Sequence, residues 1–138
     1  MLCSVGQVAD ARFFLWDTET GLIVGWISLQ PNPFTSHLCH GRFVKDIKRR
    51  ETPLYQFASC GKNTISLWHI DRSDGEVRPN PVQAADKTKR EFTVCCFSTD
   101  FEYLYCGTTT GDIACILMKN RVIQRYISGT SGMSSIRI

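Results

Sequence analysis

Residues 61–71 read GKNTISLWHID and contain the pattern that decides the fold. A Gly-Lys-Asn turn is followed by an alternation that places Ile65 and Leu67 on one side of the chain and Ser66 and Trp68 on the other. Side chains alternate with this period of two in a β-strand, whereas a helix has a period of 3.6. The segment therefore predicts a strand that follows a tight turn.

The same form occurs twice more along the chain. Upstream, residues 11–21 (ARFFLWDTETG) carry Trp16 and Asp17 before a polar turn, and downstream, residues 111–116 (GDIACI) repeat the form without a tryptophan. When the two tryptophans are aligned with Ile116, the repeat period is about 50 residues, which is typical of arrays of similar supersecondary units. The chain thus contains three repeats.

Each repeat divides into short strands that are separated by turns. In the second repeat we expect strands at 43–47, 54–59, 64–70 and 77–82, and in the third at 93–98, 103–106, 112–117 and 122–127. Gly107 and Gly111 lie in the turn between the second and third strands of the third repeat, and Asp112 opens the strand after it. The first repeat is expected to lack its first strand.

The Trp16-Asp17 and Trp68-His69 pairs, with the strand and turn pattern around them, resemble the repeats of the WD40 family. The resemblance covers nearly the whole chain and implies an all-β fold, an incomplete WD40 β-propeller of about three four-stranded antiparallel blades. The expected blade segments are 1–30, 40–84 and 92–128, with the start of a further blade at 133–138.

Three blades cannot close into the ring by which a propeller protects its strand edges. We therefore expect a fragment, a truncated gene model or one piece of a larger propeller, whose remaining blades come from the same or a larger polypeptide.

Residues 64–71, 78–79 and 103–113 carry a more particular likeness. They read TISLWHID, RP and YLYCGTTTGDI, and they are similar to the N-terminal propeller of the cilia- and flagella-associated WD-repeat protein 52 family. Members of that family bind inside ciliary doublet microtubules. The resemblance implies a structural role in the cilium or flagellum, with tubulin and other axonemal proteins as partners. The WD40 pattern by itself also fits a soluble adaptor in a ubiquitin ligase or a signalling assembly.

Two clusters of basic residues are candidates for protein binding. They comprise Lys48, Arg49 and Arg50 in one segment and Lys87, Lys89 and Arg90 in the other. Each cluster fits a solvated loop, and each also fits contact with an acidic partner such as tubulin. Basic residues outnumber acidic ones by only 16 to 13, and no aromatic residues are interleaved with the clusters as a stacking platform requires. We therefore predict no nucleic-acid partner.

Residues 37–40 (HLCH) place three metal-capable side chains close together, but a tetrahedral zinc site also needs a second pair of ligands. We predict no metal site here and a loop with incidental histidine and cysteine. The WD40 resemblance implies that His40, ahead of a strand expected from about residue 41, bonds to an aspartate and a tryptophan. The seven cysteines are odd in number and lie mostly in apolar runs, which predicts buried, reduced thiols.

Motifs for catalysis or for cofactor binding, such as GxSxG, GxGxxG, HExxH or a phosphate-binding loop, are not recognisable in the sequence. We therefore predict no catalytic residue and no cofactor. The longest apolar runs, such as 13–16 and 94–97, have the length of strands and fall far short of the roughly 20 residues of a membrane helix. The first residues do not resemble a secretory signal. These features predict a cytoplasmic, non-catalytic protein with no membrane partner.

Overall fold

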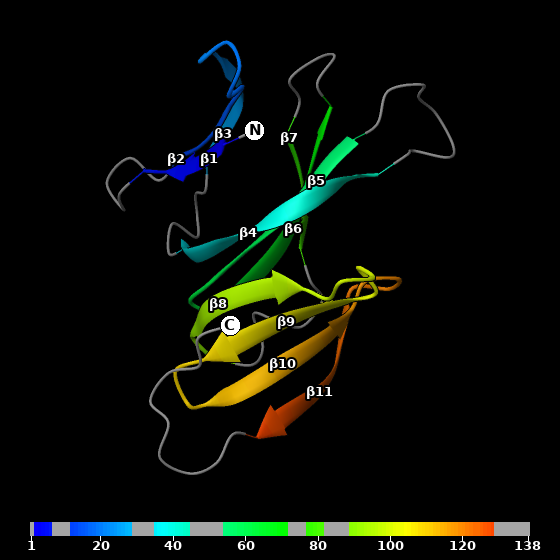
Figure 1. The fold of residues 1–138 in the computed structure, drawn as a ribbon. Helices are drawn as coiled ribbons and strands as arrows, with labels where there is room; N and C mark the ends of the chain where they lie inside the picture. The colour runs from blue at the N-terminus through cyan, green and yellow to red at the C-terminus, as the bar shows by residue number, and fades with distance from the viewer. Residues whose placement is uncertain are drawn as a thin grey trace.

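Short apolar runs and polar turns make every regular element in the described part of the chain a β-strand (Figure 1). The computed structural model describes residues 2–6, 12–28, 35–44, 54–71, 77–81 and 89–128. These residues form three antiparallel sheets with three, four and four strands. The all-β fold predicted from the sequence is confirmed.

The first sheet contains three strands in the order β1 (Leu2–Val5), β2 (Arg12–Trp16) and β3 (Ile23–Ser28). The turn between β2 and β3 is closed by the Asp17 carboxylate, which accepts a hydrogen bond from the backbone N–H of Glu19 at 2.8 Å. A short acceptor side chain at the start of a turn holds the backbone in this way. Asp17, predicted as a repeat position, therefore stabilises a local turn.

The middle sheet has the order β4 (Thr35–Val44), β5 (Leu54–Gly61), β6 (Thr64–Asp71) and β7 (Val77–Pro81). The strands β5 and β6 form a tight hairpin in which Asn63 has a φ of 56°. Asparagine is one of the few residues that tolerate this left-handed conformation, so the Gly-Lys-Asn sequence sets the turn.

The third sheet contains β8 (Phe92–Phe97), β9 (Tyr103–Thr108), β10 (Asp112–Leu117) and β11 (Val122–Ser128), paired in chain order. The bounds of β10 agree with those predicted, and the other three strands begin or end within two residues of their predicted positions.

The first strand of the middle sheet differs from the prediction. A strand was expected at 43–47, but β4 spans Thr35–Val44, so residues 37–40 lie in a strand and the prediction of a loop there was wrong. His40 lies within β4, beside a register irregularity between Cys39 and Arg42, and does not precede the strand. The polar residues of the segment 37–40 suggest a loop. The segment is nevertheless part of a strand, because the backbone of β4 pairs with the apolar strand β5. Residues 133–138 lie outside the described residues.

The middle sheet lies between the other two sheets and packs against both, as Figure 1 shows. Against the first sheet it buries one core cluster, formed by Phe13, Leu15, Tyr55, Phe57, Trp68 and Ile70. Against the third sheet it buries a second cluster, formed by Ala58, Cys60, Ile65, Leu67, Phe92, Cys95, Leu104, Cys106, Ala114 and Ile116. The alternation predicted for residues 65–68 therefore supplies both cores. Within the described residues, no helix is long and apolar enough to cross a membrane.

Candidate interaction surfaces

The two tryptophans that define the repeats occupy equivalent positions in neighbouring sheets. The Trp68 indole N–H donates to the Ser59 hydroxyl at 2.8 Å, and the Trp16 indole N–H donates to the Ser4 hydroxyl at 2.9 Å. In both sheets the serine lies on the preceding strand, two positions out of register with the tryptophan. A buried indole needs such an acceptor, so the pair is part of each sheet's architecture.

The two tryptophans differ in what covers them. Trp68 is only 5% exposed, because the first sheet packs over it and the Phe13 ring is stacked with the indole at 5.8 Å. Trp16 lies on the face of the first sheet that points away from the middle sheet and is half-buried. The face that is covered in the middle sheet is thus open in the first sheet.

The open face of the first sheet is apolar. Leu2 and Trp26 are 58% and 57% exposed and Ile23 is 48% exposed, and cross-strand pairing places all three beside Trp16 and Phe14. The Arg12 guanidinium lies 5.2 Å from the Trp26 ring centroid. Exposed apolar patches of this kind mark surfaces that bind another protein element.

A second surface lies at the end of the sheets where β5 turns into β6 and β9 turns into β10. We call it the Lys62 rim; it comprises residues 61–64, 89–91 and 108–112. The parts are joined by backbone hydrogen bonds, from Asn63 N–H to the Arg90 carbonyl at 2.9 Å and from Thr109 N–H to the Glu91 carbonyl at 3.0 Å. The rim is therefore one connected surface across two sheets.

Arg90 is held in place within this rim. Its guanidinium forms an ion pair with Asp112, donates to the Thr110 hydroxyl at 3.3 Å and lies 4.3 Å from the Tyr126 ring centroid. The hydrogen bond from Arg90 lowers the pKa of Asp112 below its usual value, with a smaller contribution from Thr110. Arg90 thus orders the rim, whereas the neighbouring Lys89 is exposed.

Of the two glycines predicted in the turn between β9 and β10, Gly111 lies in the turn and in the rim, whereas Gly107 lies in β9, so its placement in the turn was wrong. Gly111 has a φ of 85° and donates its N–H to the Thr108 carbonyl at 3.2 Å, which closes the turn between β9 and β10. Gly107 is buried and pairs with Ile113 and Val94 in the ladder. A left-handed φ favours glycine, so Gly111 has a direct conformational role.

Sequence reasoning missed Lys62, which is exposed in the hairpin turn beside Glu91. Its only sequence signal is a single basic residue directly after the glycine that ends β5. Lys48, Arg49, Arg50 and Lys87 lie outside the described residues. The strand ends that flank the first of these clusters, Val44 and Leu54, pair with each other at the end of the middle sheet opposite Lys62. Of the two clusters, only Lys89 and Arg90 are described, and both lie in the Lys62 rim.

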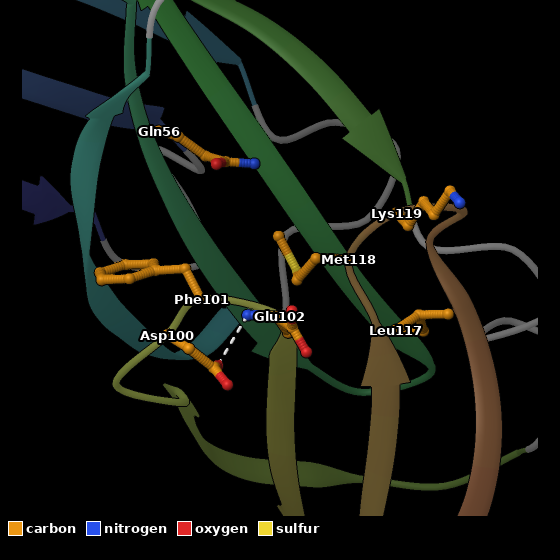
Figure 2. Close-up of a pocket in the computed structure, with 7 residues that line it drawn as sticks. All are labelled: Gln56, Asp100, Phe101, Glu102, Leu117, Met118 and Lys119. Carbon is orange, nitrogen blue, oxygen red and sulfur yellow. Dashed lines mark hydrogen bonds between the residues drawn. The ribbon is translucent and has the colours of Figure 1, made fainter.

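A groove lies at this opposite end, between the middle and third sheets (Figure 2). It has a volume of about 620 Å³ and is lined by Gln56, Asp100, Phe101, Glu102, Leu117, Met118 and Lys119. The β8–β9 and β10–β11 turns that form it are joined by a hydrogen bond from Met118 N–H to the Glu102 carbonyl at 2.9 Å. Gln56 reaches it from β5, so three separate segments build the groove.

Phe101 is the unusual residue of the groove. Its φ is 59°, in the left-handed region, where a side chain with a Cβ costs roughly 1–2 kcal/mol relative to glycine. The turn holds this conformation because the Asp100 carboxylate accepts hydrogen bonds from the Ser98 hydroxyl and from the Glu102 N–H. These two bonds, the Ser98 bond being the larger cause, lower the pKa of Asp100. The Phe101 ring also contacts Phe97, with ring centroids 5.1 Å apart.

Three thiols lie together between the middle and third sheets, where Cys95 pairs across the strands with Cys106 and Cys60 is their neighbour. Burial raises the pKa of the Cys106 thiol well above its usual value, and the neighbouring thiols raise it further. All three are buried, and none of them forms a disulfide within the described residues. Buried thiols of this kind pack as small apolar groups. The described residues contain no group of three or more metal-capable side chains arranged to hold a metal ion.

Comparison with solved structures identifies the class of fold. The chain superposes on the β-propeller domain of Cps50 (Swd1) from Myceliophteria thermophila with a TM-score of 0.58 and 19% identity, covering 95% of this chain and 39% of that one. It superposes on the Dos1 propeller with a TM-score of 0.59 and 17% identity, covering 85% and 30%. The chain has the fold of part of a WD40-type β-propeller, as predicted.

No family model matches the sequence. A curated relative is cilia- and flagella-associated protein 52 of Chlamydomonas reinhardtii, which is 26% identical to this chain over 118 residues. The match covers 86% of this chain and 17% of the relative. The chain thus spans a small part of that relative's length and less than half of either solved propeller chain.

Proposed function

We propose that this chain is part of a non-catalytic structural scaffold of the ciliary or flagellar axoneme, where it contacts tubulin and neighbouring axonemal proteins. The observation that carries the proposal is the 26% identity, over 86% of the chain, to a protein that is associated with cilia and flagella by name. A β-propeller suits such a role because its turns are presented by a rigid stack of sheets.

The basic residues supply the attraction to tubulin, whose surface is acidic. On the Lys62 rim the exposed side chains of Lys62 and Lys89 face solvent, and Arg90 fixes the backbone that carries Lys89. Complementary charge accelerates and orients association, and salt weakens it. Lys48, Arg49, Arg50 and Lys87 complete the proposed contact set.

The open face of the first sheet is the proposed contact for another propeller blade of the same or a larger polypeptide. The Trp16 and Ser4 pair reproduces the Trp68 and Ser59 pair. In the described structure the latter is covered by Phe13 and Leu15 of the preceding blade. A blade that offers two large apolar side chains at alternate positions would cover Trp16 in the same way.

Quantitative mass spectrometry of salt-washed axonemes tests the proposal. We expect the protein that contains this chain at a fixed ratio to tubulin after washing. Recovery only in a soluble complex would contradict the axonemal role and favour the adaptor. Lys89→Glu should reduce retention at moderate salt, whereas Arg125→Glu, the same charge change on the exposed outer strand β11, serves as the matched control.

A further inference from the structure

The groove between the middle and third sheets has the shape of a peptide site. Its seven lining side chains come from β5, the β8–β9 turn and the β10–β11 region, and all of them are half-buried or exposed. A site for a small molecule usually encloses most of the ligand surface. An open trough of about 620 Å³ instead suits a short extended segment of polypeptide that lays a few side chains into it.

The negative charge of the groove favours a polypeptide segment that carries a basic side chain. The carboxylates of Asp100 and Glu102 lie on one side of it, two positions apart on the same turn. Figure 2 shows that the Lys119 side chain is directed away from these two carboxylates. Hydrogen bonds from Ser98 and from the Glu102 N–H keep the Asp100 carboxylate fixed on the turn. A basic side chain therefore finds two acceptors there.

Apolar side chains also line the groove. Phe101 sits between Asp100 and Glu102 in the sequence, and Met118 and Leu117 line the groove from the facing turn (Figure 2). Phe101 has a φ of 59°, a left-handed conformation that favours glycine, so this aromatic residue adopts a locally strained backbone. Strained residues that display a side chain at the edge of a groove are characteristic of binding sites.

From this arrangement we propose that the groove binds a short segment of a partner polypeptide in which a lysine or arginine is next to an aliphatic residue. The basic group pairs with Asp100 and Glu102, and the aliphatic group packs on Phe101 and Met118. This site is distinct from the Lys62 rim and attracts the opposite charge. The proposed peptide binding does not depend on the axonemal proposal, because the test uses the purified chain without tubulin.

Fluorescence polarisation with two labelled octapeptides tests the proposal, one alternating leucine and arginine and the other alternating leucine and glutamate. We expect the purified chain to bind the arginine peptide at least about tenfold more tightly than the glutamate peptide. Glu102→Lys should weaken binding of the arginine peptide about tenfold, because it replaces attraction by repulsion. Glu19→Lys makes the same charge change on the exposed turn of the first sheet and should leave the affinity within about twofold.

Phe101→Asn gives a second, independent readout. Asparagine accepts the left-handed φ, so the turn should survive and the melting temperature should change little, while affinity for the arginine peptide falls. Amide shifts on adding the peptide should be largest at residues 98–103 and 117–121. Equal binding of the two peptides, equal losses from Glu102→Lys and Glu19→Lys, or amide shifts confined to other residues would each overturn the proposal.

Discussion

The two faces of the middle sheet are filled by different kinds of side chain, although the strands β5 and β6 contribute to both. Toward the first sheet they present the rings of Tyr55, Phe57 and Trp68, which meet Phe13. Toward the third sheet the residues are smaller; Ala58 and Cys60 of the middle sheet meet Cys95, Cys106 and Ala114. One interface is thus built mainly from stacked rings, and the other from small side chains among leucine, isoleucine and Phe92.

The difference reflects how closely the sheets approach one another. At the aromatic interface the Phe13 and Phe57 rings are stacked at 4.9 Å with an angle of 7° between their planes, so a few large side chains fill the space. At the other interface the strands β4 and β5 both lie close to β8, and several small side chains, such as those of Ala58 and Ala114, are packed among larger apolar ones. The aromatic interface should therefore be sensitive to lost volume, and the small-residue interface to added volume.

Trp68→Ala should have the largest effect, because it removes a ring that stacks against both Phe13 and Phe57 and leaves a cavity. We expect a loss of about 3–5 kcal/mol in the free energy of unfolding, measured by chemical denaturation. Trp26→Ala, which truncates a tryptophan that is 57% exposed, is the control and should cost less than about 1 kcal/mol. Similar losses for both variants would show that Trp68 has no special role between the sheets.

Ala114→Leu tests the small-residue interface by adding volume to it. Ala114 is fully buried between the middle and third sheets, so we expect a loss of about 1–3 kcal/mol from overpacking. Gln124→Leu, on an exposed position of the outer strand β11, introduces the same side chain at little cost. An Ala114→Leu protein as stable as the parent would mean that this interface has spare volume.

Much of this comparison could be predicted from the sequence. The alternation of Ile65 and Leu67 with Trp68 identified a strand with apolar side chains on both faces, and Gly111 identified a turn. The predicted bounds of β4 were wrong in part, because residues such as His37 and His40 are not typical of a strand. What makes them a strand is pairing with β5, and the residues themselves carry no local signal of it.

The groove could not be predicted for a related reason. Its lining comes from three separate segments, at residue 56, 100–102 and 117–119, so no contiguous motif contains it. The left-handed turn at Phe101 could not be recognised from the sequence either, because such a position is usually indicated by glycine or asparagine. Lys62 was overlooked because one basic residue forms no cluster; its rim exists only when the hairpin turn meets residues 89–91.

Ser59→Ala and Ser4→Ala compare the covered and the open tryptophan. Ser59 is buried, so its removal leaves the Trp68 N–H without its acceptor away from water, and we expect a loss of about 1–3 kcal/mol. Ser4→Ala should cost less than about 1 kcal/mol, because water can replace the acceptor at the half-buried Trp16. Thermal unfolding of both variants measures the difference, and a larger loss from Ser4→Ala would reverse the assignment of covered and open faces.

The smallest effect should come from the ion pair between Arg90 and Asp112, which lies outside both cores. Arg90 lowers the pKa of Asp112 in the folded protein below its value of about 3.9 in an unfolded chain. A carboxyl whose pKa is lowered by folding stabilises the fold above the unfolded pKa and loses that contribution as pH falls through the folded pKa. Asp112→Asn should therefore lower the melting temperature slightly at pH 7 and have a diminishing effect below about pH 4.

Arg90→Gln, alone and combined with Asp112→Asn, separates the ion pair from the contact between Arg90 and Tyr126. The coupling between the two substitutions, taken from melting temperatures of the four proteins across pH 3–7, should be present at neutral pH and vanish in acid. High salt should reduce the coupling as well, because the pair is partly exposed. A coupling that is unchanged by pH would mean that packing on Tyr126, and not charge, holds Arg90 on the rim. The cores between the sheets, which contain no such pair, should show neither dependence.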